Sequence, residues 1–255
     1  MMEQGSVIAA QQVDDWDRHW TELPSADISP STAYRTRVIR RLLELQPPGE
    51  GARVLEIGSG TGAFAAKFVG SYPRAEFLGL DLSAAGVAKA AGKVPSAIFR
   101  QRNLLLPPTS ADNLDFGATH AIASEVLEHV DEPDKLLRNS APYMAPGCRL
   151  IVTVPGGPLS AFHRHIGHRR HFTAGDIRDV MIRAGFEVEQ AHGVGFPFFN
   201  LYSRAVLLRG EKFIDDVGGK PGFAIRAASA VFDSLFHLNS MKSGWQMVAV
   251  GRWPG

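Results

Sequence analysis

The sequence predicts an α/β protein with a doubly wound, mostly parallel sheet. Seven short apolar runs have the length of strands, and most of them alternate with longer segments whose apolar residues recur at helical spacing. The first run, Arg53–Ile57, ends in a glycine-rich turn that leads directly into a helical pattern. Because strands that alternate with helices pair in parallel and place helices on both faces of the sheet, this order specifies a doubly wound architecture.

The chain is organised around the turn after this first strand. The string RVLEIGSGTGAF gives a buried strand, a glycine turn and the start of a helix. Gly58 allows a tight turn, and Gly60 and Gly62 lack the Cβ atoms that would keep a ligand away from the backbone. The unpaired N–H groups at the start of the helix favour negative or electron-rich groups. We therefore expect a nucleotide-binding corner here.

The identity of the nucleotide depends on one acid. The glycines also fit the dinucleotide pattern GxGxxG/A, but Glu56 lies at the end of the strand, where its carboxylate can meet an ammonium group. The whole string resembles motif I of the class I S-adenosylmethionine-dependent methyltransferases, E/D-x-G-x-G-x-G. This resemblance implies a Rossmann-like fold and S-adenosylmethionine as cofactor, with Ser59 among the residues that bind it.

The composition limits the classes of function. With 255 residues, 45% of them hydrophobic and 21% charged, the chain suits one large globular domain. A net charge of +1 gives no bulk attraction to nucleic acid or to a membrane. The single cysteine, Cys148, excludes an internal disulfide framework and suits the cytoplasm. We expect neither a signal peptide nor a run of the ~20 apolar residues that a membrane span needs.

Residues 1–45 are predicted to form an N-terminal helical cap. Trp16 and Trp20 are four apart, so they share one face of a short helix. They either staple this helix to the core or, as in many methyltransferases of this kind, close over the cofactor, with Trp20 as a cofactor contact. After a linker at 24–30, residues 33–45 have the apolar stripe of an amphipathic helix packed on the sheet edge.

The second strand, residues 76–80, ends in an acid. Asp81 lies about 20 residues after the glycine turn, where a carboxylate can accept hydrogen bonds from both ribose hydroxyls of an adenosine. We expect Leu82 to contact the same cofactor and Ser83 to cap the helix 84–93. This acid fits an NAD site equally well, so it does not separate the two cofactors.

A third strand, residues 97–100, is followed by two further cofactor candidates. Methyltransferases often place an acid near this point to bind the adenine amino group. This chain instead offers Asn103, whose amide can hydrogen-bond the ring, and Leu104, whose side chain can pack on the adenine face.

The segment after the fourth strand, residues 118–123, separates the two cofactors. Its string SEVLEHV, residues 124–130, closely resembles the corresponding segment of small-molecule methyltransferases, including the ubiquinone-type ones. NAD dehydrogenases do not usually carry it. We place Glu125 in the cofactor site and take His129 as a candidate base.

The alternation continues to the sixth strand. We predict a helix over 134–144 that ends at Ala145-Pro-Gly, and a fifth strand over 149–154. A helix over 174–184, capped by Thr173, leads to a sixth strand over 186–191.

Histidines gather in the loop before that capped helix. They are His163, His165, His168 and His171. Their density invites a zinc site, but arginines lie among them and would repel a cation, and no cysteine is near. These are Arg164, Arg169 and Arg170. We therefore expect no metal and a basic rim for an anionic acceptor, or else a solvated loop whose histidines only pack and cap. The run GHRRHFT resembles bacterial methyltransferases of polysaccharide and lipid-linked sugar pathways.

Residues 193–243 exceed a minimal fold of this kind. They hold an aromatic segment, a glycine-rich joint at 218–222 and an amphipathic helix over 224–238. They pack as core and sheet edge, form a lid over a hydrophobic substrate pocket, or rest on a membrane surface. Residues 244–255 supply the last strand, which in the resembled family runs antiparallel beside the sixth.

Together, the residues and the resemblances predict a methyltransferase whose cofactor-binding core spans residues 46–192. We expect O- or N-methylation of a secondary metabolite, sugar or lipid-linked intermediate, because the strings typical of nucleic-acid and protein amino-group methyltransferases are absent. The methyl group is already activated, so positioning and proton removal do most of the catalysis. The candidate bases are His129, His168 and His171, since neutral imidazole titrates near working pH. An NAD(P)-dependent oxidoreductase and a non-catalytic cofactor-binding protein remain as alternatives, and a homo-oligomer is left open.

Overall fold

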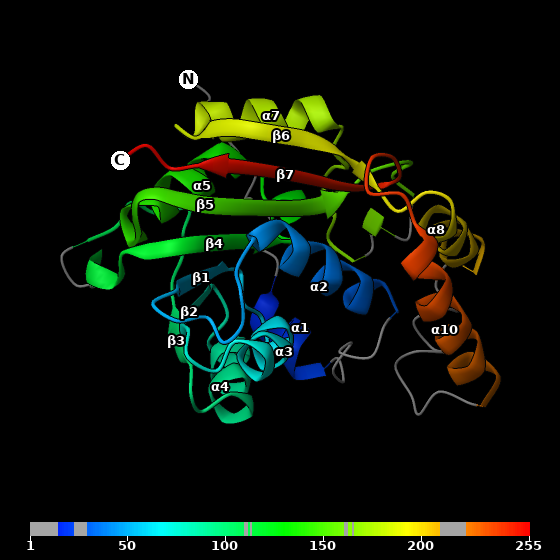
Figure 1. The fold of residues 1–255 in the computed structure, drawn as a ribbon, viewed down its shortest axis with the longest axis horizontal. Helices are drawn as coiled ribbons and strands as arrows, with labels where there is room; N and C mark the ends of the chain where they lie inside the picture. The colour runs from blue at the N-terminus through cyan, green and yellow to red at the C-terminus, as the bar shows by residue number, and fades with distance from the viewer. Residues whose placement is uncertain are drawn as a thin grey trace, which may run out of the picture.

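A seven-stranded sheet forms the centre of the protein (Figure 1). The computed structural model describes residues 15–22, 30–109, 112, 114–160, 163–164, 166–209 and 223–255. The strand order is β3-β2-β1-β4-β5-β7-β6. β7 runs antiparallel to both β5 and β6, and the other neighbouring strands are parallel. The predicted fold class is therefore confirmed, including the antiparallel last strand.

The elements follow the predicted order. The strands are β1 (Arg53–Ile57), β2 (Glu76–Asp81), β3 (Ile98–Gln101), β4 (Ala118–Ser124), β5 (Met144–Pro155), β6 (Glu187–Val194) and β7 (Gln246–Arg252). The α-helices are α1 (Trp16–Glu22), α2 (Pro30–Leu43), α3 (Ala63–Ser71), α4 (Ala84–Lys93), α5 (Pro133–Ser140), α7 (Ala174–Arg183), α8 (Phe198–Arg209) and α10 (Phe223–Leu235). Short 3-10 helices are η2 (Leu114–Phe116), η3 (Leu127–His129), η4 (Ala141–Tyr143) and η5 (Phe236–Leu238).

The sheet is buried on both faces, because successive side chains of a strand point to opposite sides. In β1, Val54 packs into the apolar core that contains residues of α2 and α3, whereas Leu55 packs into the core that contains residues of α5 and α7. Both side chains are fully buried. The strand ends that carry the predicted site residues are thus held at one edge of a rigid sheet, on either side of the switch point between β1 and β4.

The predicted boundary between the helix after the fourth strand and the fifth strand is wrong. α5 ends at Ser140, and β5 already begins at Met144, so the Ala-Pro-Gly expected to end a helix lies inside a strand. Pro142 in η4 lacks the N–H that would continue the helix. The early part of β5 is stabilised by the end of the chain, because Gly147 N donates to Trp253 O at 2.7 Å. Pairing with a distant strand overrides the local turn signal here.

The predicted N-terminal cap and the helical insertion are both present. α1 docks on the start of α4, where Asp17 Oδ1 accepts from Ser83 Oγ at 2.6 Å. α8 and α10 lie beside each other beyond one end of the sheet (Figure 1), and the rings of Phe199 and Phe236 pack on Tyr34 of α2 at 5.1 and 5.3 Å. Most of the 24–30 linker, the 218–222 joint and His165 lie outside the described residues. Of the helices described, none is both long and apolar enough to cross a bilayer.

Candidate active site

The glycine corner has the predicted geometry. Gly58 and Gly62 have φ of 72° and 74°, in the left-handed region that favours glycine. A Cβ on Gly58 would lie 2.3 Å from Val126 Cγ2, so a side chain there would clash with the segment after β4. At Gly62, the space that a Cβ would fill is taken by Ala90 of α4 at 3.0 Å. Gly62 therefore allows helix packing, and the expected close approach of a ligand does not explain it.

Helix α1 lies over this corner. A Cβ on Gly60 would come within 2.9 Å of Trp20 Cζ2, so the indole covers the glycine turn. The ring of Trp16 meets that of His129 edge-on at 4.8 Å. α1 thus joins the glycine corner to the segment after β4, which is the position that the lid interpretation requires.

Asp81 holds the glycine turn through two backbone hydrogen bonds. Its Oδ2 accepts from Gly60 N at 2.7 Å and its Oδ1 accepts from Ser83 N at 2.8 Å. Burial raises the pKa of this carboxyl above its usual value, while these backbone N–H groups oppose the rise. Ser83 also caps α4 as predicted, since its Oγ accepts from Gly86 N. A role for Asp81 toward the ribose stays a prediction.

Glu56 is a buried acid whose charge is unmatched at this corner. Its side chain is 4% exposed, and its Oε2 has no hydrogen-bond partner among the described residues. Burial, and then the charge of Asp81, raise the pKa of Glu56 well above its usual value. Ser59 Oγ is also buried without a partner in the described part of the chain. These orphaned groups fit the ammonium end of S-adenosylmethionine, because a cation there would satisfy them.

The remaining cofactor candidates differ in exposure. Leu82 is 39% exposed at the tip of β2, so its side chain is accessible to an adenine. Asn103 uses its Oδ1 to accept from Leu105 N at 2.9 Å. Leu104 is buried in the apolar core and is therefore a packing residue in this structure.

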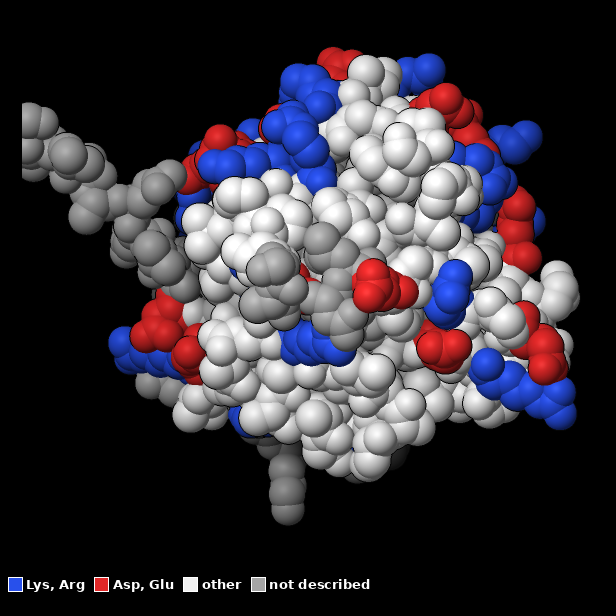
Figure 2. All heavy atoms as spheres, turned by 90° about the vertical axis from the view of Figure 1, so that its left-hand side faces the viewer, with Lys and Arg blue, Asp and Glu red and all other residues white. Residues whose placement is uncertain are grey.

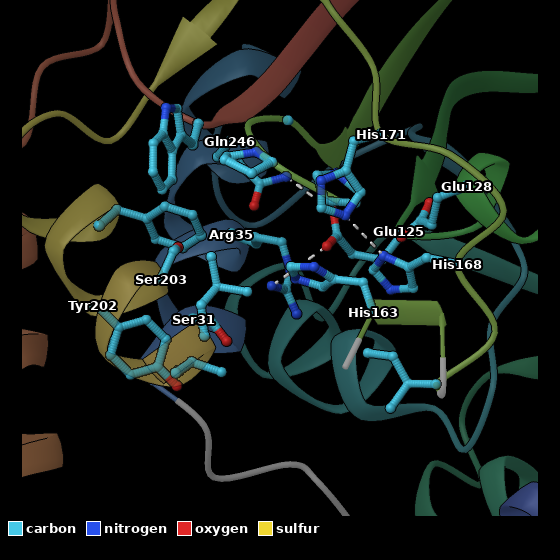
Figure 3. Close-up of a pocket in the computed structure, with 18 of the residues that line it drawn as sticks. Ser31, Arg35, Glu125, Glu128, His163, His168, His171, Tyr202, Ser203 and Gln246 are labelled. Carbon is cyan, nitrogen blue, oxygen red and sulfur yellow. Dashed lines mark hydrogen bonds and ion pairs between the residues drawn. The ribbon is translucent and has the colours of Figure 1, made fainter. Parts of the chain in front are cut away.

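A pocket of about 340 Å³ opens beside the segment after β4 (Figure 3). It is bounded by α2, by the loop after β5, by α8 and by the start of β7. Its polar lining includes Ser31, Thr32, Arg35, Glu125, Glu128, Tyr202, Ser203 and Gln246. Its apolar lining includes Ile166, Phe199, Val206, Leu207 and Trp245.

Glu125, which was predicted to lie in the cofactor site, lines this pocket and is held there by groups from several elements (Figure 3). Its Oε1 accepts from Gln246 Nε2 at 2.9 Å, and its Oε2 lies 3.5 Å from Arg35 Nη1. Its φ is 56°, an unusual backbone conformation for a residue other than glycine. Neither Arg35 nor Gln246 was predicted, because an arginine on an amphipathic helix and a glutamine at a strand start carry no local signal of function.

The structure brings the three candidate bases together. The ring centroid of His168 lies 4.9 Å from that of His129 and 5.4 Å from that of His171. His163 joins this cluster, with its ring centroid 4.3 Å from that of His171. Burial is the main cause that lowers the pKa of His168 to about 2 and that of His163 to about 4, so both imidazoles are neutral at working pH.

The arginines of the loop lie outside this cluster. Arg169 forms an ion pair with the Asp131 carboxylate, and Arg170 donates to Asp131 O at 3.1 Å. Arg164 is exposed. None of the three lines the pocket, so the basic rim expected for an anionic acceptor is not formed by these side chains. The expectation of a metal-free loop rested on the same arginines and loses that support.

The surface charge agrees with the low net charge. On the face shown in Figure 2, Lys and Arg side chains alternate with Asp and Glu. Among the described residues of this face there is no broad one-sign patch of the kind that attracts a nucleic-acid backbone.

Comparisons with known proteins identify the family of the chain. The family described as "Methyltransferase domain" matches residues 31–191. Trans-aconitate 2-methyltransferase of Methylobacterium nodulans is 34% identical over 151 residues, which are 59% of this chain and 54% of that protein. The protein of the same name from Deinococcus radiodurans is 30% identical over 182 residues, which are 71% of this chain and 66% of that protein. The chain thus spans about half to two thirds of the length of these curated relatives.

A solved structure extends the likeness to the fold. Phosphoethanolamine N-methyltransferase 2 of Haemonchus contortus, in complex with S-adenosyl-L-methionine, aligns with a TM-score of 0.57 and 15% identity over 89% of this chain and 54% of that chain. The family match covers more than half of the chain and includes both the glycine corner and the SEVLEHV segment. The resemblance predicted from these motifs is therefore confirmed, and the chain belongs to the methyltransferase domain family of S-adenosylmethionine-dependent enzymes.

Proposed function

We propose that this chain transfers the methyl group of S-adenosylmethionine to an oxygen or nitrogen atom of a small molecule held in the 340 Å³ pocket. The observation that carries this proposal is that one segment, residues 125–128 after β4, forms a wall shared by the cofactor corner and the pocket. Val126 packs against Gly58 of the cofactor corner, while Glu125 and Glu128 of the same segment line the pocket. A methyl donor at the corner and an acceptor in the pocket are thus neighbours.

Each side of this wall has a separate task. The cofactor supplies an activated methyl group, so the chain has to bind, orient and remove a proton. On the cofactor side, Glu56 meets the ammonium group and Asp81 the ribose. On the acceptor side, Glu125 with its partners orients the polar groups of the acceptor, and the neighbouring histidine cluster assists the loss of its proton. Trp16 and Trp20 of α1 keep water from the reacting atoms.

The lining of the pocket favours an amphipathic acceptor of low charge. α8 contributes an apolar wall, and the opposite side is polar. Arg35, the one arginine or lysine among the lining residues, is already paired with Glu125. The side chains of the pocket by themselves would leave most of the charge of a tricarboxylate, the acceptor in the names of the curated relatives, uncompensated. A hydroxyl or amine on a partly apolar molecule suits the pocket better.

We also propose that residues 193–243 form the lid of this pocket. Tyr202, Ser203, Val206 and Leu207 of α8 line it, which supports a substrate role beyond core packing. Exposed apolar side chains on the same unit, such as Leu201 and Leu208, keep a membrane-facing surface as the alternative. With residues 193–243 as the lid, we propose that residues 1–45 form a cap and residues 46–192 form the cofactor-binding core.

An acceptor screen tests the function. Hydroxylated amphipathic compounds, amines and trans-aconitate are incubated with isotope-labelled S-adenosylmethionine, and products are followed by mass spectrometry. We expect label in a hydroxyl or amine compound. His171→Ala should lower turnover while its affinity for S-adenosylhomocysteine stays within a few tenths of a kcal/mol. Binding of the cofactor without turnover of any acceptor would favour the non-catalytic alternative, and preferred turnover of trans-aconitate would overturn the acceptor class.

A further inference from the structure

We propose that Glu128, His129 and His168 bind a divalent first-row transition-metal ion that holds and activates the acceptor. This inference rests on the proposed methyl transfer and deepens it. One ligand atom from each of the three side chains lies within 4.8 Å of the others. Ligand atoms that share an ion at about 2.0–2.2 Å lie roughly 3–4 Å apart, so small side-chain rotations complete the site.

One backbone hydrogen bond and one contact of a side chain with the backbone hold the ligand-bearing segments together. Glu128 and His129 belong to η3, directly after β4, and His168 belongs to the loop between β5 and α7. Arg169 N donates to Glu128 O at 2.8 Å, and His129 Nδ1 lies 3.1 Å from Gly167 O. The two segments are therefore joined on both sides of the three ligands, so the site does not depend on a single flexible loop.

The hydrogen bonds set both imidazoles in the tautomer that binds a metal. A carbonyl oxygen only accepts, so His129 Nδ1 carries the proton toward Gly167 O and Nε2 keeps its lone pair. His171 Nδ1 likewise donates to Gly157 O at 3.1 Å. His171 Nε2 must then accept from His168 Nδ1 at 3.2 Å, which leaves the lone pair of His168 on Nε2 (Figure 3). Such outer hydrogen bonds are typical of metal-binding histidines.

The carboxylate of Glu128 supplies an independent observation. Its side chain is fully buried, and both carboxylate oxygens lack a hydrogen-bond partner among the described residues. Its Oε1 lies 3.9 Å from His129 Nε2. Burying an unpaired acid is costly, and a bound cation removes that cost.

The composition of the site indicates its metal and its role. Two imidazoles and one carboxylate suit Zn²⁺, Co²⁺ or Mn²⁺ better than Mg²⁺ or Ca²⁺, which prefer oxygen ligands only. All three ligands line the pocket, so the open coordination positions face the acceptor. A hydroxyl bound there has a lowered pKa and releases its proton to water. Its oxygen then forms the bond to the methyl carbon as the bond from carbon to sulfur breaks, which yields the methyl ether and S-adenosylhomocysteine.

Metal titration tests the ligand set without an acceptor. Chelator-treated protein is titrated with Co²⁺, and binding is followed by calorimetry and by the visible absorption of the Co²⁺ ion. We expect one ion per chain, and at least ~100-fold weaker binding in Glu128→Gln and His168→Ala, because each loses a direct ligand. His171→Ala keeps the three ligands but removes the hydrogen bond that sets the tautomer of His168. Its Co²⁺ affinity should therefore fall by roughly 10–100-fold.

Glu125→Gln is the matched control. It removes the same charge from the same pocket but leaves the three ligands in place, so its Co²⁺ affinity should stay within about threefold. Equal weakening in Glu125→Gln and Glu128→Gln, or no stoichiometric binding in the parent chain, would overturn the site. S-adenosylhomocysteine affinity, measured in each variant, reports that the fold is intact.

Activity separates this inference from the proposed function. Chelator should abolish methyl transfer, and Zn²⁺ or Co²⁺ should restore it. Full turnover by metal-free protein would overturn the metal's role and leave the proposed function standing. Metal and cofactor binding without turnover of any acceptor would count against the proposed function and leave the metal site standing.

Discussion

Asp81→Ala tests how the carboxylate at the tip of β2 serves both the fold and the cofactor. This carboxylate accepts hydrogen bonds from Gly60 N and Ser83 N. A hydrogen bond to a charged group contributes about 1.5–3 kcal/mol, but burial of the carboxylate, seen in its raised pKa, offsets part of the two bonds. We therefore expect unfolding stability to fall by about 1.5–3 kcal/mol in total.

The affinity for the cofactor should fall separately. Loss of the proposed ribose contacts weakens S-adenosylhomocysteine binding by about 1.5–3 kcal/mol, which is roughly 10- to 150-fold in Kd. Calorimetry measures the affinity, and urea unfolding measures the stability of the same sample. Because Asp81 also holds Gly60, an indirect effect has to be separated from a direct one.

A ligand lacking the ribose hydroxyls makes this separation. The parent chain should lose affinity for the 2′,3′-dideoxy analogue of S-adenosylhomocysteine, whereas Asp81→Ala should bind both ligands equally, because the interaction is already gone. If the parent chain and the variant lose affinity for the analogue by the same factor, Asp81 does not contact the ribose. Unchanged affinity of the folded variant for S-adenosylhomocysteine itself would make Asp81 a turn residue only.

Three further predictions address other parts of the chain. The protein should bind S-adenosylhomocysteine more tightly than NAD in calorimetry. Tighter binding of NAD would instead support the NAD(P)-dependent oxidoreductase hypothesis. Glu56 has a folded pKa raised above its unfolded value, so the stability it contributes is present below the unfolded pKa of about 4.5 and is lost as pH rises through the folded pKa. Melting temperatures of the cofactor-free protein should therefore decline less across this range in Glu56→Gln than in the parent, and parallel curves would contradict the assignment. Thr173 and Asp176 form a capping box at the start of α7, so Thr173→Ala should lower stability by about 1 kcal/mol while S-adenosylhomocysteine affinity is unchanged.

Local patterns were sufficient where a structure is determined by neighbours in the chain. The turn at Gly58, the cap at Ser83 and the helix start at Thr173 follow from the conformations and hydrogen bonds of a few adjacent residues. The apolar periods gave the order of strands and helices, and topology rules then implied a doubly wound sheet. Glu56 and Asp81 were predicted to bind the cofactor from their distances along the chain to that turn, and their roles stay predictions.

Long-range packing determined the rest. The start of β5 depends on hydrogen bonds with the end of the chain near Trp253. The local sequence of residues 144–148 does not predict this pairing. The pocket combines Arg35, Glu125 and Gln246, whose positions are far apart in the sequence and meet only through the sheet.

The histidine loop shows the division between sequence and tertiary structure most clearly. The sequence alone showed histidines and arginines interleaved, and the charge of the arginines argued against a cation. Side-chain direction is set by the partners that the fold supplies, and here Asp131 draws Arg169 and Arg170 away while the rings of His129 and His168 meet. Sequence by itself determined the cofactor corner, because that corner is built from consecutive residues. Only the tertiary structure decided which side chains line the pocket, because those residues come from segments that are far apart in the sequence.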